Sequence, residues 1–314
     1  MNTIGSYLTT TFRYLLAVGL VAAAATWTTV SAQYPDTVYV EGNCAGGTPS
    51  IPGACGDYDG DGAACAVEDA DADSVFCTIQ AALEAIDHNG KVVIVSSGVY
   101  NENVYIGQAF GGFAFGATNP GNVTLEGAPG VEATIDAFSA TSTAGDNDAR
   151  SQGAGISVNY TTTGNSRVVT IRNVEVRNFA IGIAADNNSR VNIDNVRVEN
   201  NLFFGIRLSN QTRGAISNSH VTATGFRLSN APAPATPAGQ TAFVGSGIFA
   251  NQNSHAFIVE TVSSHNSNWG IATNNAAPNT AAATVSRVSA PFNNSGPFTG
   301  NVIQCTNTAI CSAP

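Results

Sequence analysis

The chain has 314 residues, a formal net charge of -10 at pH 7 and only 11% charged residues. The shortage of Lys and Arg argues against nucleic acid or anionic lipid as partners, because phosphate binding depends on a surplus of positive charge. The same charge would repel an acidic polysaccharide unless calcium intervened. Abundant small polar residues favour closely stacked backbone with polar turns over amphipathic helical bundles.

The first 32 residues have the features of a signal peptide. Arg13 precedes an apolar run, Tyr14 to Trp27, and residues 30–32 (VSA) are small where signal peptidase requires it. The run is too short to cross a bilayer core, which takes about 20 residues. We therefore expect cleavage after Ala32, no membrane span afterwards, and a secreted, periplasmic or cell-surface protein.

Residues 33–76 form a Cys- and Asp-rich segment. Six cysteines in an exported chain favour disulfides, and local pairing would staple both ends, with residues 297–314 as a disulfide-closed tail. The pairing of the first four leaves three alternatives. Zinc is disfavoured because no two of these four have Cys-x-x-Cys spacing. The cysteines are Cys44, Cys55, Cys65 and Cys77 near the start and Cys305 and Cys311 near the end.

Within that segment, residues 56–68 (GDYDGDGAACAVE) have the spacing of a calcium loop. Carboxylates, a glycine, a backbone carbonyl and a final glutamate fall where such a loop needs them. The Asp-rich run that follows resembles the calcium repeats of thrombospondin type 3. Glycine and proline before the loop leave no preceding helix, so a paired EF-hand is excluded, and the alternatives are a structural calcium site and a flexible acidic loop. The candidate ligands are Asp57, Asp59, Asp61, Ala63 and Glu68.

From residue 168 onward the chain repeats a unit of about 22 residues. Ile171, Ile193 and Ile216 recur at this spacing, and asparagines two residues later recur with them. Apolar residues alternate briefly, break at Asn or Gly and resume, which indicates short strands separated by tight turns. Three strands per repeat predict a coil, and stacked coils place equivalent strands about 4.8 Å apart as parallel sheets.

These repeats resemble the right-handed parallel β-helix of the pectin-lyase-like superfamily. The resemblance rests on asparagines that end one strand and Gly-Ile pairs that open another, namely Asn173, Asn195 and Asn218, and the pairs at 182, 205, 247 and 270. It implies an all-β solenoid over residues 77–296. A leucine-rich repeat is disfavoured because the columns hold Ile and Val. Residues 77–106 predict a short capping helix with Ile79, Leu83 and Ile86 on one face, followed by strands.

Members of this superfamily that cleave polysaccharide bind it along the strand that begins, by resemblance, at the Gly-Ile pairs. Alternation there turns Ile183, Ile206, Ile248 and Ile271 inward and Ala184, Arg207, Phe249 and Ala272 outward. Aromatic faces pack against sugar C–H surfaces, so exposed aromatics beside an arginine would bind glycan. The predicted sugar-binding strip consists of Arg207, Phe249, Trp269, Phe203 and Asp186.

Catalytic motifs of the related enzymes are incomplete. Residues 98–102 (GVYNE) match one element of pectin methylesterases, but the later esterase, polygalacturonase and alginate-epimerase motifs are absent, so we expect Glu102 to be a surface residue. β-Elimination needs a base beside a neutralised carboxylate, and hydrolysis needs two facing carboxyls. Arg207 could neutralise the substrate carboxylate, which is one of the two conditions for β-elimination. The three histidines predicted on other strands or turns, His220, His255 and His265, are interpreted as solvated.

Three functions remain open from the sequence. The favoured one is an exported protein that binds extracellular or cell-envelope polysaccharide in a lateral groove without cleaving it. The second is a divergent polysaccharide lyase or glycoside hydrolase, and the third is a structural or adhesive surface protein. The Pro-rich insert at residues 231–241 would either wall the groove or hang as a surface loop.

Overall fold

The protein is described by a computed structural model that covers residues 36–41, 75–86, 89–107, 121–137, 153–159, 167–225, 240–274, 278 and 280–305. All of them belong to one compact unit, Pro35–Pro314. The expected signal peptide and calcium loop, and most of the Pro-rich insert, lie outside the described residues. Within those residues, no helix is long and apolar enough to span a membrane.

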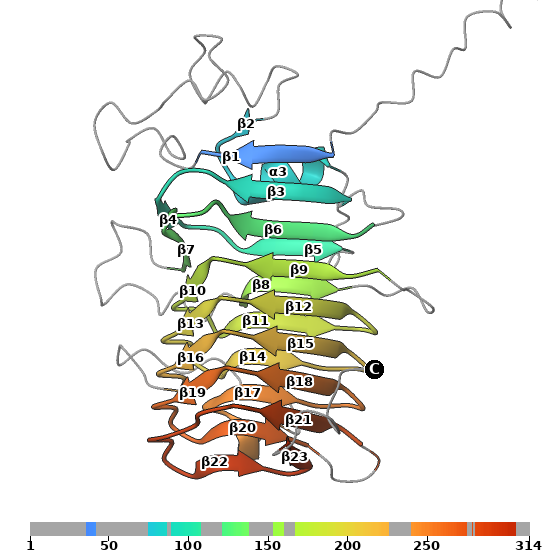
Figure 1. Cartoon of the computed structure of the whole chain (residues 1–314), viewed down its shortest axis with the longest axis vertical. Helices are drawn as coiled ribbons and strands as arrows, with labels where there is room; N and C mark the ends of the chain where they lie inside the picture. The colour runs from blue at the N-terminus through green and yellow to red at the C-terminus, as the bar shows by residue number, and fades with distance from the viewer. Residues whose placement is uncertain are drawn as a thin grey trace, which may run out of the picture. The chain divides into compact units, whose positions relative to one another are not determined.

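The described chain winds through three parallel sheets, and each coil from β3 to β20 contributes one strand to each sheet (Figure 1). Sheet A consists of β2 (Val75–Phe76), β1 (Thr37–Val40), β3 (Gly90–Ile94), β6 (Val123–Gly127), β9 (Val169–Arg172), β12 (Arg190–Asp194), β15 (Arg213–Ser217), β18 (His255–Val259), β21 (Ala282–Ser286) and β23 (Val302–Cys305). Sheet B consists of β19 (Val262–Ser264), β16 (His220–Thr222), β13 (Arg197–Glu199), β10 (Glu175–Arg177), β7 (Ala133–Asp136) and β4 (Gly98–Tyr100). Sheet C consists of β22 (Gly296–Thr299), β20 (Trp269–Thr273), β17 (Ser246–Ala250), β14 (Phe204–Leu208), β11 (Ile181–Asp186), β8 (Ala154–Asn159) and β5 (Val104–Gly107).

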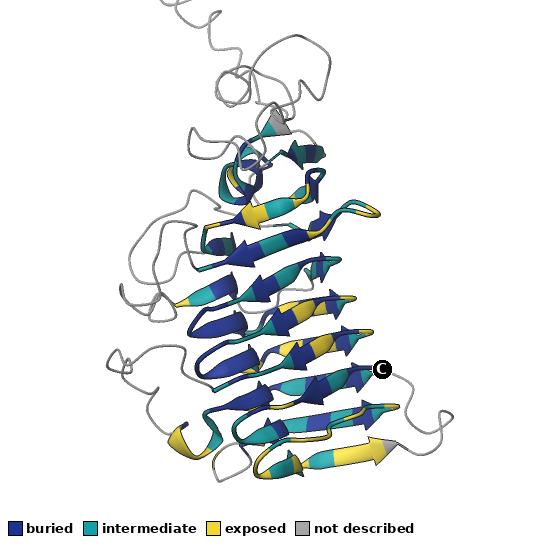
Figure 2. Cartoon of the chain, turned by 90° about the vertical axis from the view of Figure 1, so that its left-hand side faces the viewer, coloured by how far each residue is buried: buried dark blue, intermediate teal, exposed yellow. Residues whose placement is uncertain are grey.

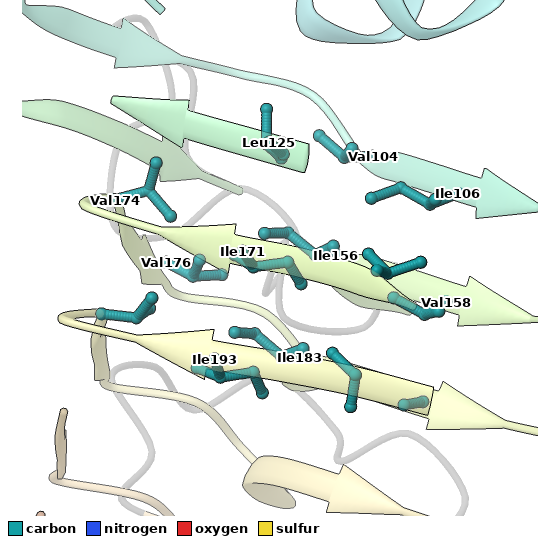
Figure 3. Packing of buried hydrophobic residues seen from close by; sticks show 14 of the residues in the cluster. Val104, Ile106, Leu125, Ile156, Val158, Ile171, Val174, Val176, Ile183 and Ile193 are labelled. Carbon is teal, nitrogen blue, oxygen red and sulfur yellow. The ribbon is translucent and has the colours of Figure 1, made fainter. Parts of the chain in front are cut away.

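The predicted repeat register is confirmed. Ile171 pairs with Ile193, which pairs with Ile216 on the next coil, and Ile216 pairs with Ile258 beyond the insert. Stacked side chains of this kind fill the interior between the sheets (Figure 3), where Ile171 and Ile193 are 0% exposed. Burying each such side chain contributes roughly 1.5–3 kcal/mol, so the columns are the main source of stability.

Short turns between sheets A and B depend on a left-handed residue. Asn173, Asn195 and Asn218 have φ of 56°, 52° and 49°. Asparagine tolerates this conformation better than most residues because its short polar side chain can hydrogen-bond locally. The side chains also bond along the stack, with Asn195 Nδ2 donating to Asn173 Oδ1 at 2.9 Å. The asparagines that punctuate the sequence are thus the corners of the coil.

The predicted cap is confirmed as α3 (Ile79–Ala85), which buries Ile79 and Leu83 against the first coil, with Ile86 just after it. The expectation that Glu102 is a surface residue is wrong. Its carboxylate accepts hydrogen bonds of 2.9 Å from the backbone N–H groups of Ile79 and Gln80 at the start of α3. Burial raises the pKa of Glu102, and these two donors act against the rise. Glu102 therefore ties the cap to the solenoid.

The stack also takes in strands outside the predicted range of 77–296. At one end, β1 pairs in register with β3 and with β2. At the other end, β23 pairs with β21. In sheet A, buried and more exposed residues alternate along the strands (Figure 2), most regularly in β12 and β15, whereas β11 and β17 of sheet C are buried throughout. The outward faces of sheets A and B are therefore the surfaces most open to ligands.

Candidate functional site

The structure confirms which side chains of sheet C face inward. Ile183, Ile206, Ile248 and Ile271 are paired in one column and belong to the main core. Their neighbours Ala184, Arg207, Phe249 and Ala272 form the next column and leave the core on the outer side. Arg207 and Phe249 of the predicted strip therefore lie on the outer side of sheet C, as the alternation predicted.

Facing outward does not expose the aromatic members of the strip. Phe249 is 0% exposed and Phe203 is 6% exposed, so the expectation of an exposed phenylalanine is wrong. Phe249 is stacked between Phe204 and Phe243, with ring centroids 4.7 and 5.0 Å away. Of the three aromatic residues of the strip, Trp269 alone keeps partial exposure, at the margin of this second apolar cluster. These phenylalanines stabilise the outer layer of sheet C and are not available to stack on a sugar.

Arg207 and Asp186 are adjacent but bind one another. Arg207 Nη2 donates to Asp186 Oδ2 at 2.7 Å, and their side chains are only 14% and 11% exposed. The guanidinium that was expected to neutralise a uronate is therefore already neutralised from within the protein. This makes the strip a poor site for β-elimination, which needs that charge for the substrate.

The candidate calcium ligands Asp57, Asp59, Asp61, Ala63 and Glu68 lie outside the described residues. In the part of the chain that is described, no group of three or more His, Cys, Asp or Glu side chains is arranged to hold a metal ion. Calcium therefore stays a prediction that concerns the loop alone.

The outer face of sheet A contains a hollow of about 550 Å³. His255 and Phe257 stack in it with ring centroids 4.3 Å apart and planes inclined by 12°. Arg190 and Arg213 project into it from the two preceding coils, in register with His255. Asn192, Asn253 and Thr280 supply polar groups around the rings.

Charge in this hollow is positive. Among the described residues that line it there is no Asp or Glu, although the chain has 22 acidic residues and only 12 Lys and Arg. Burial and the charge of Arg213 lower the pKa of His255, which is therefore neutral at neutral pH. His255 is half-buried because its ring stacks on Phe257, so it is less solvated than expected, whereas His220 and His265 are exposed as expected.

A second hollow, of about 640 Å³, lies on the outer face of sheet B. Glu175, Arg197 and His220 line it in one column, with Glu132 at its edge. Burial raises the pKa of Glu175, and the neighbouring carboxylate of Glu199 raises it further. Arg197 Nε donates to Glu199 at 2.9 Å, and Arg177 Nη1 donates to Glu175 at 3.2 Å, so each glutamate is paired with an arginine.

Sequence reasoning missed the hollow on sheet A although the signal was present. Arg190 and Arg213 are separated by the same 23 residues as Ile193 and Ile216, which places the arginines in one column. His255 was harder to place, because the insert between β16 and β17 breaks the spacing. Aligning Ile258 with Ile216 would have added it.

Comparison with protein families gives one result. The family described as "Right handed beta helix region" matches residues 154–312, about half of the 314 residues. Searches of curated proteins and of solved structures each return no match. The matched range contains β8, the complete coils from β9 onward and the paired Ile and Asn columns. The chain therefore belongs to the right-handed β-helix family.

Proposed function

We propose that this protein is an exported β-helix that binds extracellular or cell-envelope polysaccharide on its lateral surface. The observation that carries the proposal is the flat His255–Phe257 ring pair, set in a hollow with amide and hydroxyl side chains. Sugar binding combines an apolar face with convergent polar groups, and this hollow has both. Export is supported by the leader-like first 32 residues and by Cys77, which is disulfide-bonded.

Affinity electrophoresis against a panel of neutral and acidic polysaccharides tests the proposal. Phe257→Ala removes the ring under His255 and is expected to weaken binding at least about tenfold, as for a central aromatic contact. Phe292→Ala is the matched control, because Phe292 is 75% exposed and packs beside His265 away from the hollow. Unretarded migration in every gel of the panel would refute polysaccharide binding and favour a structural or adhesive role.

Glycoside hydrolysis is the second candidate, and the sheet B hollow favours it over a lyase. Hydrolysis uses one carboxyl that holds its proton and one that is ionised. Burial and the neighbouring Glu199 raise the pKa of Glu175, which favours the first of these two roles for Glu175. Release of reducing ends from the bound polysaccharide, lost in Glu175→Gln, would support hydrolysis. Unsaturated products would point to a lyase instead.

We also propose that the loop of residues 57–68 binds calcium and that this ion has a structural role. The support is the ligand spacing in the sequence. Its place in the chain before the cap helix suggests a stabilising role at the N-terminal end and none in the lateral hollows.

A further inference from the structure

We propose that Arg190, Arg213 and His255 form a binding column for a polyanionic polysaccharide along the outer face of sheet A. The inference rests on the proposed function and names the class of ligand. It places the ligand on a different face from the sheet C groove that the family resemblance implies.

The geometry of the column follows from strand register. Arg190 pairs with Arg213, and Arg213 pairs with His255, at the first position of three successive strands. Adjacent strands are about 4.8 Å apart, so the three side chains leave the sheet in line, one per coil. A polymer that lies along the stack would present successive sugar residues to successive coils.

These two arginines differ from others in the described chain. Five arginines, Arg172, Arg177, Arg197, Arg207 and Arg287, pair with a carboxylate. Among the described residues, neither Arg190 nor Arg213 forms an ion pair, and both are exposed. Two guanidiniums side by side repel one another, and like charges directly opposite on neighbouring strands are destabilising. An anion bound between them would remove that repulsion.

Acidic groups elsewhere on sheet A are already engaged. Glu126 forms ion pairs with both Lys91 and Arg172. Asp194 accepts hydrogen bonds from Ser217 Oγ at 2.7 Å and Asn218 Nδ2 at 2.8 Å. Among the described residues, neither carboxylate therefore forms an ion pair with an arginine of the column.

Ring pair and arginines together define the chemistry of the ligand. A sugar ring would lie against His255 and Phe257, while its acidic substituent reaches the Arg213 guanidinium. Arginine binds both carboxylate and sulfate in a bidentate fashion, so the shared chemistry is an acidic glycan of either kind. The net charge of -10 opposes the binding of any polyanion to the protein as a whole. Binding of a polyanion would therefore have to come from a local positive site.

Three polymers with one backbone test the inference: dextran, carboxymethyl dextran and dextran sulfate of equal length. We expect the full chain to bind at least one charged polymer more tightly than dextran by tenfold or more in calorimetry. Arg213→Gln should reduce that affinity at least tenfold, and Arg190→Gln/Arg213→Gln should abolish the preference over dextran. Arg287→Gln is the matched control, because it removes the same charge from an exposed residue outside the hollow.

Each other result has a defined meaning. Equal affinity for dextran and its charged forms, still lost in Phe257→Ala, overturns the polyanion column and leaves polysaccharide binding intact. Charged polymers that bind wild type and Arg213→Gln equally overturn the site. If none of the three polymers binds while a neutral polysaccharide of the panel does, the polyanion inference alone fails. Thermal melts of each variant establish that it is folded.

Discussion

Arg207 on β14 and Asp186 on β11 form an ion pair of 2.7 Å between neighbouring coils, and both side chains are largely buried. Arg207 Nε is itself buried and has no hydrogen-bond partner among the described residues, so Asp186 is the main compensation for the guanidinium. The pair explains how an arginine is tolerated in the aromatic outer layer of sheet C. It stabilises the fold at the position where a substrate charge was expected.

Removing the negative charge of this pair should destabilise the protein strongly. Asp186→Asn leaves the buried guanidinium uncompensated, which costs about 3–5 kcal/mol in buried pairs. Glu260→Gln is the matched control, since Glu260 pairs with Arg287 at 2.7 Å but both are about half exposed. That control should cost about 0–1 kcal/mol. Denaturant unfolding of both variants gives the comparison, and equal losses would contradict the role assigned to Asp186.

Gly205 is expected to be intolerant of any side chain. A Cβ there would lie 2.3 Å from Val221 Cγ1 and 2.6 Å from the backbone oxygen of Gly247 on the next coil. Gly205→Ala should therefore cost about 1–3 kcal/mol by overpacking. Gly130→Ala, which meets nothing within 4 Å but has a φ of 81°, separates this steric cost from backbone strain. A smaller loss at 205 than at 130 would count against close packing.

The corner asparagines predict a different pattern. Asn195→Ala must keep a φ of 52° and loses the 2.9 Å bond to Asn173, so we expect a loss of about 1–2 kcal/mol from backbone strain alone. Asn195→Gly keeps the turn accessible and should lose less. Unfolding free energies of the two variants decide the matter. Identical losses would show that the side-chain bond, and not the left-handed turn, selects asparagine.

The sequence predicted the inside of this protein better than its outside. The repeat itself determines where Ile193 and Asn195 lie. A residue at a given position of the repeat lies beside the equivalent residues on the two neighbouring coils. Phe249 shows the limit of that reasoning. Alternation says that it leaves the core, but its burial depends on Phe204 and Phe243, which stack on it from another coil and from a short 3-10 turn.

The same limit applies to charge. The spacing placed Arg207 outward and Asp186 near it, yet only side-chain geometry reveals that they pair. Glu102 was likewise misjudged, since its partner is the start of a helix more than 20 residues earlier. Partners that lie outside the repeat leave no periodic signal.

Binding of an acidic polymer should strengthen in mild acid. Burial and Arg213 hold the pKa of His255 below its usual value, whereas an anion in the column would favour the imidazolium. Lowering the pH from about 7.5 to about 5.5 should therefore increase affinity for dextran sulfate in calorimetry. His255→Gln should lose the increase. His220→Gln on sheet B, where burial and Arg197 also lower the pKa of the histidine, should retain it.

Mild acid has the opposite effect on the stability of the protein without ligand. Because the pKa of His255 is lower in the folded protein than its usual value of about 6.5, the unfolded chain takes up the proton first as the pH falls. Without ligand, the contribution of His255 to stability is complete above that value and decreases below it. Melts in the absence of polymer that became more stable in acid through His255 would contradict this assignment.

Calcium in the loop of residues 57–68 is tested by removal. If Asp57, Asp59, Asp61, Ala63 and Glu68 hold an ion, a chelator should lower the melting temperature, by about 2–4 °C for each kcal/mol of stabilisation. Glu68→Gln should reduce this response, while Glu84→Gln, on the exposed side of α3, should not. An unchanged melt with chelator, together with no calcium uptake in calorimetry, would remove the ion from the account.

The contact of Glu102 with α3 bears on how such a protein lengthens during evolution. The helix, together with β1 and β2, covers that end of the stack, so coils are added by duplication within the stack or at its other end. A duplicated β12 coil would bring its own corner asparagine, core isoleucine and surface arginine in the correct phase. One such event would extend the cationic column by about 4.8 Å and leave its neighbours unchanged. The number of coils would thus set the length of polymer that the protein recognises.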